Sequence, residues 1–332
     1  MKTAFFSLLL LSSVSARSLG NRFDSWLNEY RVAVNDDDSY IGMLKKWSDN
    51  DKFIEEVNAK NLSHSLGHNQ FSGMDGDDYK LYLGYSSSIG VTKRLGAMRW
   101  MDTSAVESSV NWVEKGGVTP VKDQGQCGSC WSFSTTGALE GAYFAKNGEL
   151  VSFSEQQLVD CDNLRNGGRD QGCNGGLMDN AFAWIGKNGG LCAETDYPYV
   201  SGTTKTQGTC VKTCKVLDGS SVVKYVDVSP SDDAQMMAAI SQQPVAIAIE
   251  ADQKEFQLYK SGVFSGTCGT TLDHGVLAVG YGTENGEDYY LVKNSWGTTW
   301  GSSGFIKLVR GMTVNGGAGQ CGMLLQASYP VV

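Results

Sequence analysis

All nine cysteines of this chain lie between Cys127 and Cys321, and this distribution constrains the fold more than any other feature of the sequence. Disulfides form in oxidising compartments, so a cysteine-rich unit behind a cysteine-free one predicts two separately stabilised parts of a secreted protein. Because nine is an odd number, one thiol stays unpaired if the other eight form bridges. We therefore expect a disulfide-braced domain that keeps one free cysteine.

The N-terminus has the features of a signal peptide. Lys2 supplies a positive charge, residues 4–11 are mostly apolar, and Val14-Ser15-Ala16 fits the small-residue pattern of a cleavage site. A membrane-spanning helix needs about 20 apolar residues, roughly twice the length of this run. We therefore expect a signal peptide at residues 1–16, no membrane span, and delivery by the secretory pathway to the extracellular space or to an acidic, lysosome- or vacuole-like compartment.

Apolar spacing predicts helices in the first part of the chain and strands in the second. Helices are expected over residues 23–30, 41–62, 131–146, 155–161 and 178–187. Strands are expected over residues 222–228, 245–249, 276–281, 289–293 and 305–309, with one helix at residues 233–242. A half that is mostly α followed by a half that is mostly β predicts an α+β fold with two lobes, and the cleft between them is a common location for chemistry.

The chain has only three histidines, and this small number limits the chemistry. His64 and His68 lie in the cysteine-free part, so a histidine that serves the cysteine-rich part has to be His274. A mixed Cys/His zinc site needs clustered ligands. Because His274 lies six residues beyond its nearest cysteine, Cys268, metal binding is disfavoured, and no cofactor is expected.

Cys127-Gly128-Ser129-Cys130 is a C-x-x-C motif with three readings. A redox dithiol would follow a strand in a βαβ unit, a pattern that the flanking sequence lacks. A structural disulfide is the second reading. In the third, Cys130 begins a helix whose positive end favours a thiolate, and the imidazolium of His274 favours it further. Such a pair is a strong nucleophile at acidic to neutral pH.

Three segments in this order resemble the papain-like cysteine peptidases, and among them the cathepsin L-type endopeptidases. They are Cys127-Gly128-Ser129-Cys130-Trp131, Leu272-Asp273-His274-Gly275 and Lys293-Asn294-Ser295-Trp296-Gly297. The likeness extends over nearly everything after the signal peptide. It implies a papain-like two-lobed fold with a helical lobe and a β-barrel-like lobe, an N-terminal helical propeptide and a cysteine endopeptidase activity.

The resemblance assigns roles to five residues. Cys130 is expected to attack the scissile carbonyl and His274 to carry the proton to the leaving amine. Asn294 would orient the imidazole, and Trp296 would shield that hydrogen bond from water. Gln124 would donate its side-chain N–H to the oxyanion, beside the backbone N–H of Cys130; the loss of one such donor typically lowers turnover by ~10²–10³.

The resemblance also implies how the cysteines pair. The expected bridges are Cys127–Cys173, Cys161–Cys210, Cys192–Cys214 and Cys268–Cys321. The bridge between Cys192 and Cys214 is additional to the basic family pattern, and an exchange of partners between Cys210 and Cys214 is the alternative. Cys130 is then the free thiol.

The resemblance further outlines the substrate-binding residues. The S2 pocket receives the second substrate side chain before the cleaved bond. Its expected surroundings are Leu177, Met178, Ala248, Leu272, Gly275 and Gln326, and Asp273 is a further expected substrate-binding residue. Gly175 and Gly176 would let an extended peptide backbone approach closely. We expect a preference for apolar side chains, with Arg accepted weakly; in the alternative reading, Gln326 points to solvent and has no effect.

Residues 17–105 resemble the inhibitory propeptide of the family, followed by a peptidase domain at residues 106–332. Trp47, Asn50, Ile54 and Asn58 keep the spacing of its main helix, and Gly67, Asn69 and Phe71 match its next motif. Met43, Ser39 and Gly73 stand where Arg, Glu and Asp are expected, and that Asp is credited with sensing pH. Maturation is expected near Ala105/Val106, and a simple folding aid is the alternative role.

Two other functions are compatible with this fold, a catalytically silent storage or binding protein and an exopeptidase, and the residues disfavour both. Every catalytic position is filled, and no histidine is left for an element that would block part of the cleft. The expected partners are polypeptide substrates, the chain's own propeptide and cystatin-like protein inhibitors, with the enzyme a monomer. The net charge of −9 and the absence of a basic stripe argue against nucleic-acid binding.

Overall fold

The computed structural model describes residues 19–85, 97–104 and 106–332. The expected signal peptide and Ala105, which precedes the expected maturation cut, lie outside these ranges. The longer helices are one over residues 19–29, α2 Asp37–Asn58, α4 Cys130–Asn147, α5 Glu155–Cys161, α6 Met178–Asn188 and α8 Asp233–Gln242. The short helical turns are α3 Gly76–Tyr79, η1 Lys80–Tyr82, η3 Leu164–Asn166, η4 Gly172–Asn174, α7 Ser201–Thr204, α9 Lys254–Gln257, η5 Val314–Gly317 and η6 Gln320–Gly322.

A single sheet joins the strands of the described chain. They are β1 His64–Leu66, β2 Ala97–Met98, β3 Val110–Asn111, β4 Lys224–Asp227, β5 Val245–Ile249, β6 Tyr259–Phe264, β7 His274–Glu284, β8 Glu287–Lys293, β9 Phe305–Val309 and β10 Ala327–Val331. Their order is β1-β6-β9-β8-β7-β5-β10-β4-β2, and β3 pairs with β7. This path does not close, so the expected barrel-like lobe is an open sheet.

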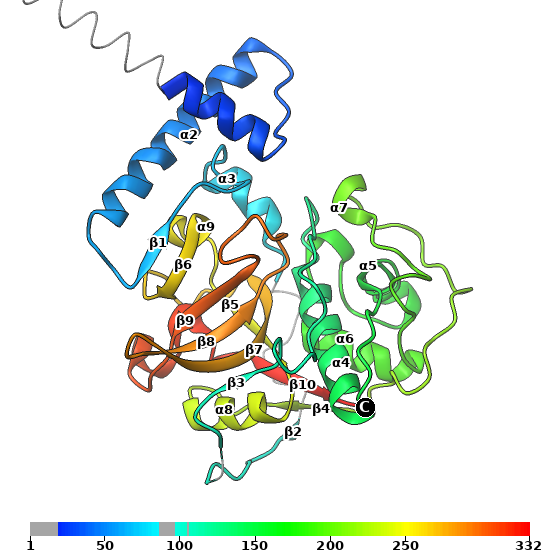
Figure 1. The fold of residues 1–332 in the computed structure, drawn as a ribbon. Helices are drawn as coiled ribbons and strands as arrows, with labels where there is room; N and C mark the ends of the chain where they lie inside the picture. The colour runs from blue at the N-terminus through cyan, green and yellow to red at the C-terminus, as the bar shows by residue number, and fades with distance from the viewer. Residues whose placement is uncertain (1–18, 86–96, 105) are drawn as a thin grey trace, which may run out of the picture.

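The two expected lobes lie side by side in Figure 1, the helical one around α4, α5 and α6 (green) and the other around β5 to β9 (yellow to red). Helix α4 borders the sheet and is buried from Cys130 to Tyr143, as a helix packed on all sides must be. It ends at Gly148, whose φ of 73° is the left-handed conformation typical of a helix C-terminus. Within the described residues, no helix has both the length and the apolar character needed to cross a membrane.

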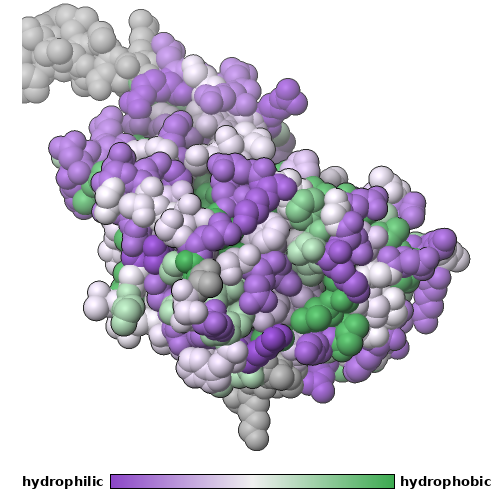
Figure 2. Space-filling model, turned by 60° about the horizontal axis from the view of Figure 1, so that its bottom comes forward, coloured by the Kyte–Doolittle hydropathy of each residue, from purple (hydrophilic) through white to green (hydrophobic). Residues whose placement is uncertain are grey.

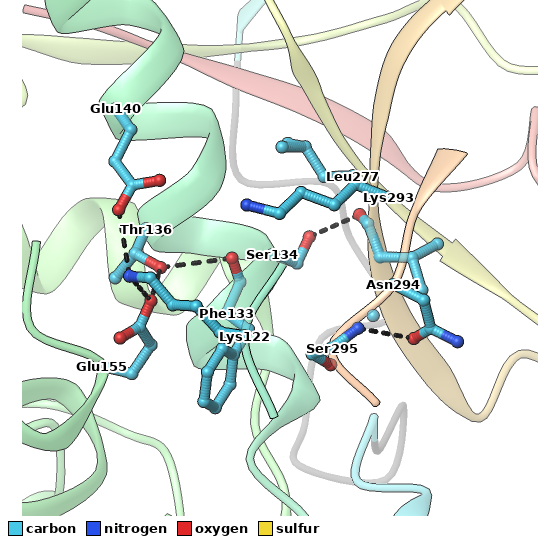
Figure 3. Close-up of a pocket in the computed structure, with 12 residues that line it drawn as sticks. Lys122, Phe133, Ser134, Thr136, Glu140, Glu155, Leu277, Lys293, Asn294 and Ser295 are labelled. Atoms are coloured by element: carbon cyan, nitrogen blue, oxygen red, sulfur yellow. Dashed lines mark hydrogen bonds and ion pairs between the residues drawn. The ribbon is translucent and has the colours of Figure 1, made fainter. Parts of the chain in front are cut away.

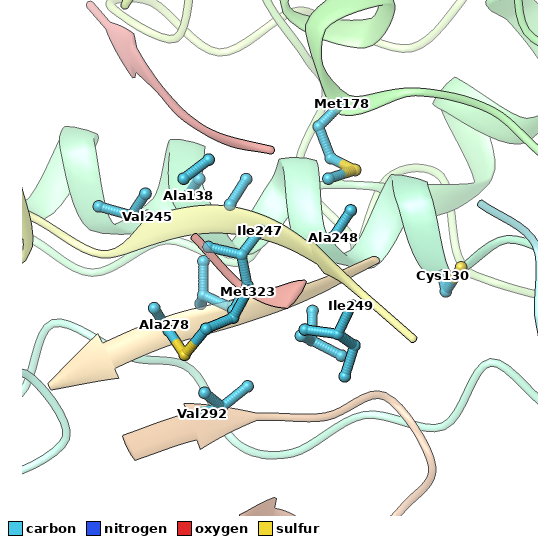
Figure 4. Close-up of a cluster of buried hydrophobic side chains, with 14 of the residues drawn as sticks. Cys130, Ala138, Met178, Val245, Ile247, Ala248, Ile249, Ala278, Val292 and Met323 are labelled. Carbon is cyan, nitrogen blue, oxygen red and sulfur yellow. The ribbon is translucent and has the colours of Figure 1, made fainter. Parts of the chain in front are cut away.

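The core is continuous from α4 into the sheet. All five side chains of β5 are buried, because α4 covers one side of the strand and its neighbours in the lobe cover the other. Figure 4 shows Val245, Ile247 and Ile249 along β5 and Met323 reaching toward Ala278 of β7. Figure 2 shows a face on which hydrophilic side chains predominate and hydrophobic ones gather in small patches.

Four disulfides brace the cysteine-rich part. They join Cys127 to Cys173, Cys161 to Cys210, Cys192 to Cys214 and Cys268 to Cys321. These are the four expected bridges: three follow the family pattern, and Cys192–Cys214 joins the two cysteines that this pattern leaves over. Cys130 is the free cysteine of the described chain. The first three bridges lie in the helical lobe, and the fourth joins the loop before β7 to η6.

The N-terminal segment packs on the strand lobe and has a small core of its own. Phe23 and Trp26 of the first helix meet Trp47 of α2 in a buried aromatic cluster. Strand β1 pairs antiparallel with β6 and so adds an edge strand to the sheet. Asn50 anchors α2 by donating to the carbonyl oxygens of Ser72 (2.8 Å) and Met74 (3.0 Å). The unit without cysteines is therefore held by aromatic packing and by strand pairing.

The departure at Gly73 has a steric reason. A Cβ at this position would lie 2.7 Å from the Trp26 ring and 2.8 Å from Cγ of Met43. The aspartate expected here therefore has no room. Met43, which stands where Arg is expected, fills part of that space, so the two departures from the family pattern are in contact with each other.

Candidate active site

Four of the predicted site residues come from separate segments that meet between the lobes. Cys130 is the first residue of α4, His274 is the first residue of β7, and Asn294 follows β8 directly. Gln124 lies before α4, where its backbone N–H donates to the carbonyl oxygen of Ser295 (2.8 Å). The side chains of all four predicted residues are buried.

His274 is held in one orientation. Its Nε2 lies 2.8 Å from Oδ1 of Asn294, and that oxygen also accepts the backbone N–H of Ser295 (2.8 Å). An amide oxygen can only accept, so Nε2 carries the hydrogen and Nδ1 keeps its lone pair. Nδ1 is buried without a partner among the described residues. The ring of Trp296 stacks on the imidazole at 4.4 Å and covers this pair.

Cys130 is buried in this structure and its sulfur is hydrogen-bonded. The backbone N–H of Gly275 donates to Sγ (3.3 Å), and the N–H of Gly84 is a second donor. Burial raises the pKa of the Cys130 thiol to about 12 and lowers the pKa of His274 to about 4. The covered site therefore favours a neutral thiol and a neutral imidazole, in contrast to the thiolate and imidazolium expected from the sequence.

Gln124 directs its amide N–H₂ into the site. Its Oε1 accepts the hydroxyl of Ser295 (2.7 Å), which fixes the orientation of the amide. Its Nε2 donates to the carbonyl oxygens of Cys127 (2.9 Å) and Tyr82 (2.8 Å). A backbone carbonyl of the N-terminal segment thus occupies the donor that was predicted to bind an oxyanion.

The chain's own residues 82–85 lie across the site. The N–H of Gly176 donates to the carbonyl oxygen of Gly84 (3.0 Å), and the N–H of Tyr85 donates to that of Asp273 (3.0 Å). Tyr85 and Gly176 form a parallel β-bridge. A peptide backbone is therefore bound on both sides of the cleft, and it covers Cys130.

Gly84 makes this close approach feasible. A Cβ on Gly84 would lie 2.0 Å from the carbonyl oxygen of Gly128 and 2.2 Å from its carbon. Real Cβ atoms essentially never come within 3.0 Å of another heavy atom, so only glycine fits here. Nothing in the local sequence distinguishes this glycine from the many others, because the constraint comes from a segment more than forty residues away.

Most of the predicted S2 residues are brought together by the pairing of β5 with β7. Ala248 lies opposite Gly275 in that pair, and a Cβ on Gly275 would lie 3.2 Å from Sδ of Met178. Gln326 is partly buried beside them, and its carbonyl oxygen accepts the N–H of Ala248 (2.9 Å).

The remaining predicted residues lie around this group. Leu177 is buried, whereas Leu272 is partly buried and lies against Gly322 on the loop after β9. Gly175 adopts φ 109°, and Gly176 lies against the ring of Trp131, which leaves no room for a side chain. Burial raises the pKa of Asp273 to about 7.

A polar cavity lies between the lobes behind Asn294 (Figure 3). Lys122 donates to Glu140 (3.1 Å) and to Glu155 (2.6 Å) within it. Burial disfavours the charge of Lys122, but the two carboxylates outweigh burial and hold its pKa above the usual range. Burial lowers the pKa of Lys293 to about 8. Sequence inspection did not single out this cluster, because its members come from four segments and form no motif.

Comparison with known proteins gives a consistent result. Residues 106–331 match the family model described as papain family cysteine protease. The chain is 48% identical over 286 residues to a probable cysteine protease, RD21B, of Arabidopsis thaliana; the match covers 86% of this chain and 60% of that protein. The chain thus spans less than two thirds of the length of that relative.

Two solved structures, one of a precursor and one of a proenzyme, are similar over most of the chain. A recombinant stem bromelain precursor aligns with a TM-score of 0.84 and 36% identity, covering 95% of this chain and 99% of that one. The digestive procathepsin L2 proteinase of the Tenebrio molitor larval midgut aligns with a TM-score of 0.84 and 33% identity, covering 95% and 100%. The predicted family and fold are confirmed, and the chain belongs to the papain family of cysteine proteases.

Proposed function

We propose that this chain is the zymogen of a cysteine endopeptidase in which Cys130 is the nucleophile. In the processed enzyme the thiolate sulfur attacks the scissile carbonyl carbon, and the electron pair of the C=O bond moves to oxygen. The C–N bond then breaks, and the leaving amine takes the proton of the His274 imidazolium. A thioester on Cys130 remains. Water, deprotonated by the neutral His274, attacks it and releases the acid and the thiolate.

The supporting residues follow from the hydrogen bonds of the site. Asn294 holds the Nε2 hydrogen of His274, which leaves Nδ1 as the atom that exchanges the proton with sulfur. Gln124 and the backbone N–H of Cys130 are the proposed oxyanion donors, because preorganised donors stabilise charge that develops in the transition state. Trp296 keeps water from the bond between His274 and Asn294.

One observation carries the proposal: the site already binds a peptide backbone. Residues 82–85 bond to Gly176, Asp273 and Gln124 at 2.8–3.0 Å while covering the sulfur of Cys130. A substrate that replaced this segment would use the same backbone partners. The parallel bridge at Gly176 fixes the direction in which the inhibitory segment runs, and the close contact of Gly84 with Gly128 fixes its position.

The ion pair expected from the sequence belongs, in this proposal, to the uncovered site. Residues 82–85 contribute to the burial that keeps Cys130 and His274 neutral. When the segment leaves, water and the N-terminus of α4 favour the thiolate, and the thiolate in turn favours the imidazolium. Zymogen conversion then creates the nucleophile at the same time as it opens the cleft.

The proposed organisation follows the expected boundaries. Residues 1–16 direct the chain into the secretory pathway, residues 17–105 are the inhibitory propeptide, and residues 106–332 are the peptidase domain. The destination is the extracellular space or an acidic lysosome- or vacuole-like compartment. Polypeptides are the substrates, cystatin-like proteins are proposed inhibitors, and the processed enzyme is proposed to act as a monomer without a metal or cofactor.

The S2 pocket sets the proposed specificity. Its walls are apolar at Met178, Ala248 and Leu177, which favours Leu or Phe as the second residue before the cut. Gln326 is uncharged, so it offers no ion pair to an arginine side chain. A peptide panel on the processed enzyme should therefore give a higher kcat/KM for Phe than for Arg at this position; equal values would contradict this assignment.

The central test is covalent labelling by an epoxide thiol inhibitor. The processed wild-type enzyme should be labelled once and lose activity, and the Cys130→Ala variant should neither react nor hydrolyse peptides. The variant Ser129→Ala is a matched control beside the nucleophile. An unlabelled and inactive wild type would refute the peptidase proposal and favour a silent relative.

A further inference from the structure

Two buried carboxyl groups lie beside the peptide-binding loop, and the mechanism proposed above does not use them. Asp162 follows α5, and Asp170 precedes the loop that contains Gly176 and Leu177. The side chains of both aspartates are almost fully buried. Neither belongs to a motif that was recognised in the sequence.

Asp170 holds the end of the loop in place. Its Oδ1 accepts the backbone N–H of Leu177 (3.1 Å) and the side-chain N–H₂ of Asn180 (2.9 Å). Leu177 is the N-cap residue of α6 and its own side chain makes no cap hydrogen bond. The N–H groups at a helix N-terminus have no partner within the helix. Asp170, which lies outside α6, accepts one of these N–H groups.

The two carboxyl groups lie close together, and each has one oxygen without a hydrogen-bond donor in the described part of the chain. Oδ1 of Asp162 accepts the N–H of Arg169 (3.1 Å), whereas Oδ2 of Asp162 and Oδ2 of Asp170 are buried and meet no donor among the described residues. The two side chains are nevertheless within hydrogen-bonding range of each other. Two carboxylates can only accept, so a hydrogen bond between them requires a proton on one of the two groups. One proton between the two Oδ2 atoms would give both of these buried oxygens a partner.

The electrostatics agree with a shared proton. Burial raises the pKa of Asp170 well above its usual range, and the charge of Asp162 raises it further. Burial also raises the pKa of Asp162. Two like charges forced together in a buried site cannot both ionise without strong repulsion, so the pair retains one proton at a pH where an exposed aspartate has lost it.

The charged groups around the pair do not neutralise it. Lys187 on α6 favours ionisation of Asp162, but its effect is smaller than that of burial. Arg165 and Arg169 on the connecting loop are exposed. Asp160 on α5 directs its carboxylate elsewhere, since it accepts the hydroxyl of Tyr197 (2.8 Å).

The loop that Asp170 holds is the one that contacts the bound peptide. Gly176, directly before Leu177, donates its N–H to the carbonyl oxygen of Gly84 (3.0 Å). Gly176 also lies against the ring of Trp131, so it has no side chain by which it could be anchored. The position of its N–H therefore depends on its neighbours along the chain.

We propose that Asp170 is a positioning residue whose bond with Asp162, made through one shared proton, fixes Gly176 and Leu177 for peptide binding. This inference rests on the proposed function, because the loop that it positions is the proposed peptide-binding loop. As the pH rises and the proton leaves, the two carboxylates repel each other and the loop shifts. Peptide binding then weakens while the chemical step at Cys130 continues.

The test is the pH dependence of KM. In Asp170→Asn the amide keeps an acceptor for Leu177 and offers Asp162 a donor that does not titrate. Between pH 5 and pH 8 the KM of the processed wild type should rise by about three- to tenfold, the range expected for one weakened hydrogen bond. The KM of D170N should stay level, and Asp196→Asn, which changes an exposed carboxyl of the same lobe, should follow the wild type. A slope in D170N equal to that of the wild type would overturn the proposal.

A second measurement does not depend on activity. With a raised pKa, the folded chain keeps a proton that the unfolded chain releases, so stability falls as the pH rises above about 4, the ordinary value for an aspartate. In full-length chains that carry Cys130→Ala, the Tm of D170N should therefore gain on that of its parent from pH 4 to pH 8. A constant difference would overturn the shared proton. A growing difference together with an inactive wild-type enzyme would refute the peptidase proposal alone.

Discussion

Replacing Gly84 by alanine should uncover the active site, although the substitution changes none of the proposed catalytic residues. The new Cβ would lie 2.0 Å from the carbonyl oxygen of Gly128, although heavy atoms essentially never come within 3.0 Å of a real Cβ. The inhibitory segment or the Gly128 loop must therefore move by about 1 Å or more. The Gly128 loop is tied by the disulfide of Cys127 and by its own bond to Cys173 O (3.0 Å), so we expect the inhibitory segment to move.

That movement removes the backbone bonds that hold the segment. The bonds from Gly176 to Gly84 and from Tyr85 to Asp273 are both 3.0 Å long. Each is worth about 1 kcal/mol net, so their loss weakens the closed state by about 2 kcal/mol. This corresponds to a roughly 30-fold larger population of the open state.

The assay is the rate at which an epoxide thiol inhibitor labels the unprocessed zymogen at neutral pH. G84A should react about 30-fold faster than the wild type. Gly76→Ala is the matched control, because a Cβ at this position meets nothing within 4 Å. G76A should react like the wild type. Equal protection of G84A and the wild type would refute the claim that this segment closes the site through the contact at Gly84.

Three further predictions concern the active site and the N-terminal segment that covers it. Gln124→Ala should lower kcat of the processed enzyme by ~10²–10³ in steady-state assays, the usual loss for one oxyanion donor; an unchanged kcat would remove Gln124 from the mechanism. Burial lowers the pKa of His68, which stacks on Trp47 and is bonded to Asp51 inside the N-terminal segment. The unfolded segment therefore binds a proton that the folded one excludes, and the folded segment loses stability as the pH falls below about 6.5. His68→Gln should accordingly move half-maximal activation to lower pH, and an unshifted activation curve would contradict this role. Finally, iodoacetamide should alkylate Cys130 slowly in the zymogen up to pH 8, because burial raises its pKa to about 12, but rapidly at pH ~5 in the processed enzyme; equal rates would show that the segment does not control the thiol.

The elements with clear periodicity could be predicted from the sequence. Residues 233–242, 245–249 and 305–309 form α8, β5 and β9 with the predicted bounds. β10 was not predicted, because a proline such as Pro330 argues against a strand. In the structure Pro330 nevertheless lies opposite Tyr225 in the pairing of β10 with β4. β6 was missed because Lys260, Ser261 and Gly262 interrupt its apolar pattern; its pairing with β1 and β9 comes from distant parts of the chain.

The predicted site residues depended on counting and on motifs, and both have limits. His274 could be identified because the cysteine-rich part has no other histidine, and Cys130 because it begins a helix. Gly84 and Asp170 could not be found in this way. Their roles depend on what lies opposite them in the fold, Gly128 in one case and Asp162 in the other, and a single sequence does not contain that information.

The contact between Met43 and Gly73 links two departures from the family pattern. The family has Arg and Asp at these two positions, and here both positions lie in an apolar contact with each other, with the Trp26 ring beside Gly73. Gly73 cannot titrate as an aspartate at this position would. The N-terminal segment still has pH-sensitive groups in its histidines, whose pKa values burial lowers. His64 lies against Phe264 of the strand lobe, so its protonation acts on the docked face of the segment.

The pairing of β1 with β6 has a consequence for the enzyme after maturation. The proposed removal of residues 17–105 would take β1 away and leave one edge of β6 without a partner strand, while β9 stays paired with its other edge. An open edge of this kind can seed aggregation. Lys260 and Ser261 are exposed on this edge, and Gly262 bends it at φ 85°. A charge and a bend are the usual protections of such an edge. Lys260 and Gly262 interrupt the apolar pattern by which β6 could have been predicted. The same two residues should keep the processed enzyme from aggregating through this edge.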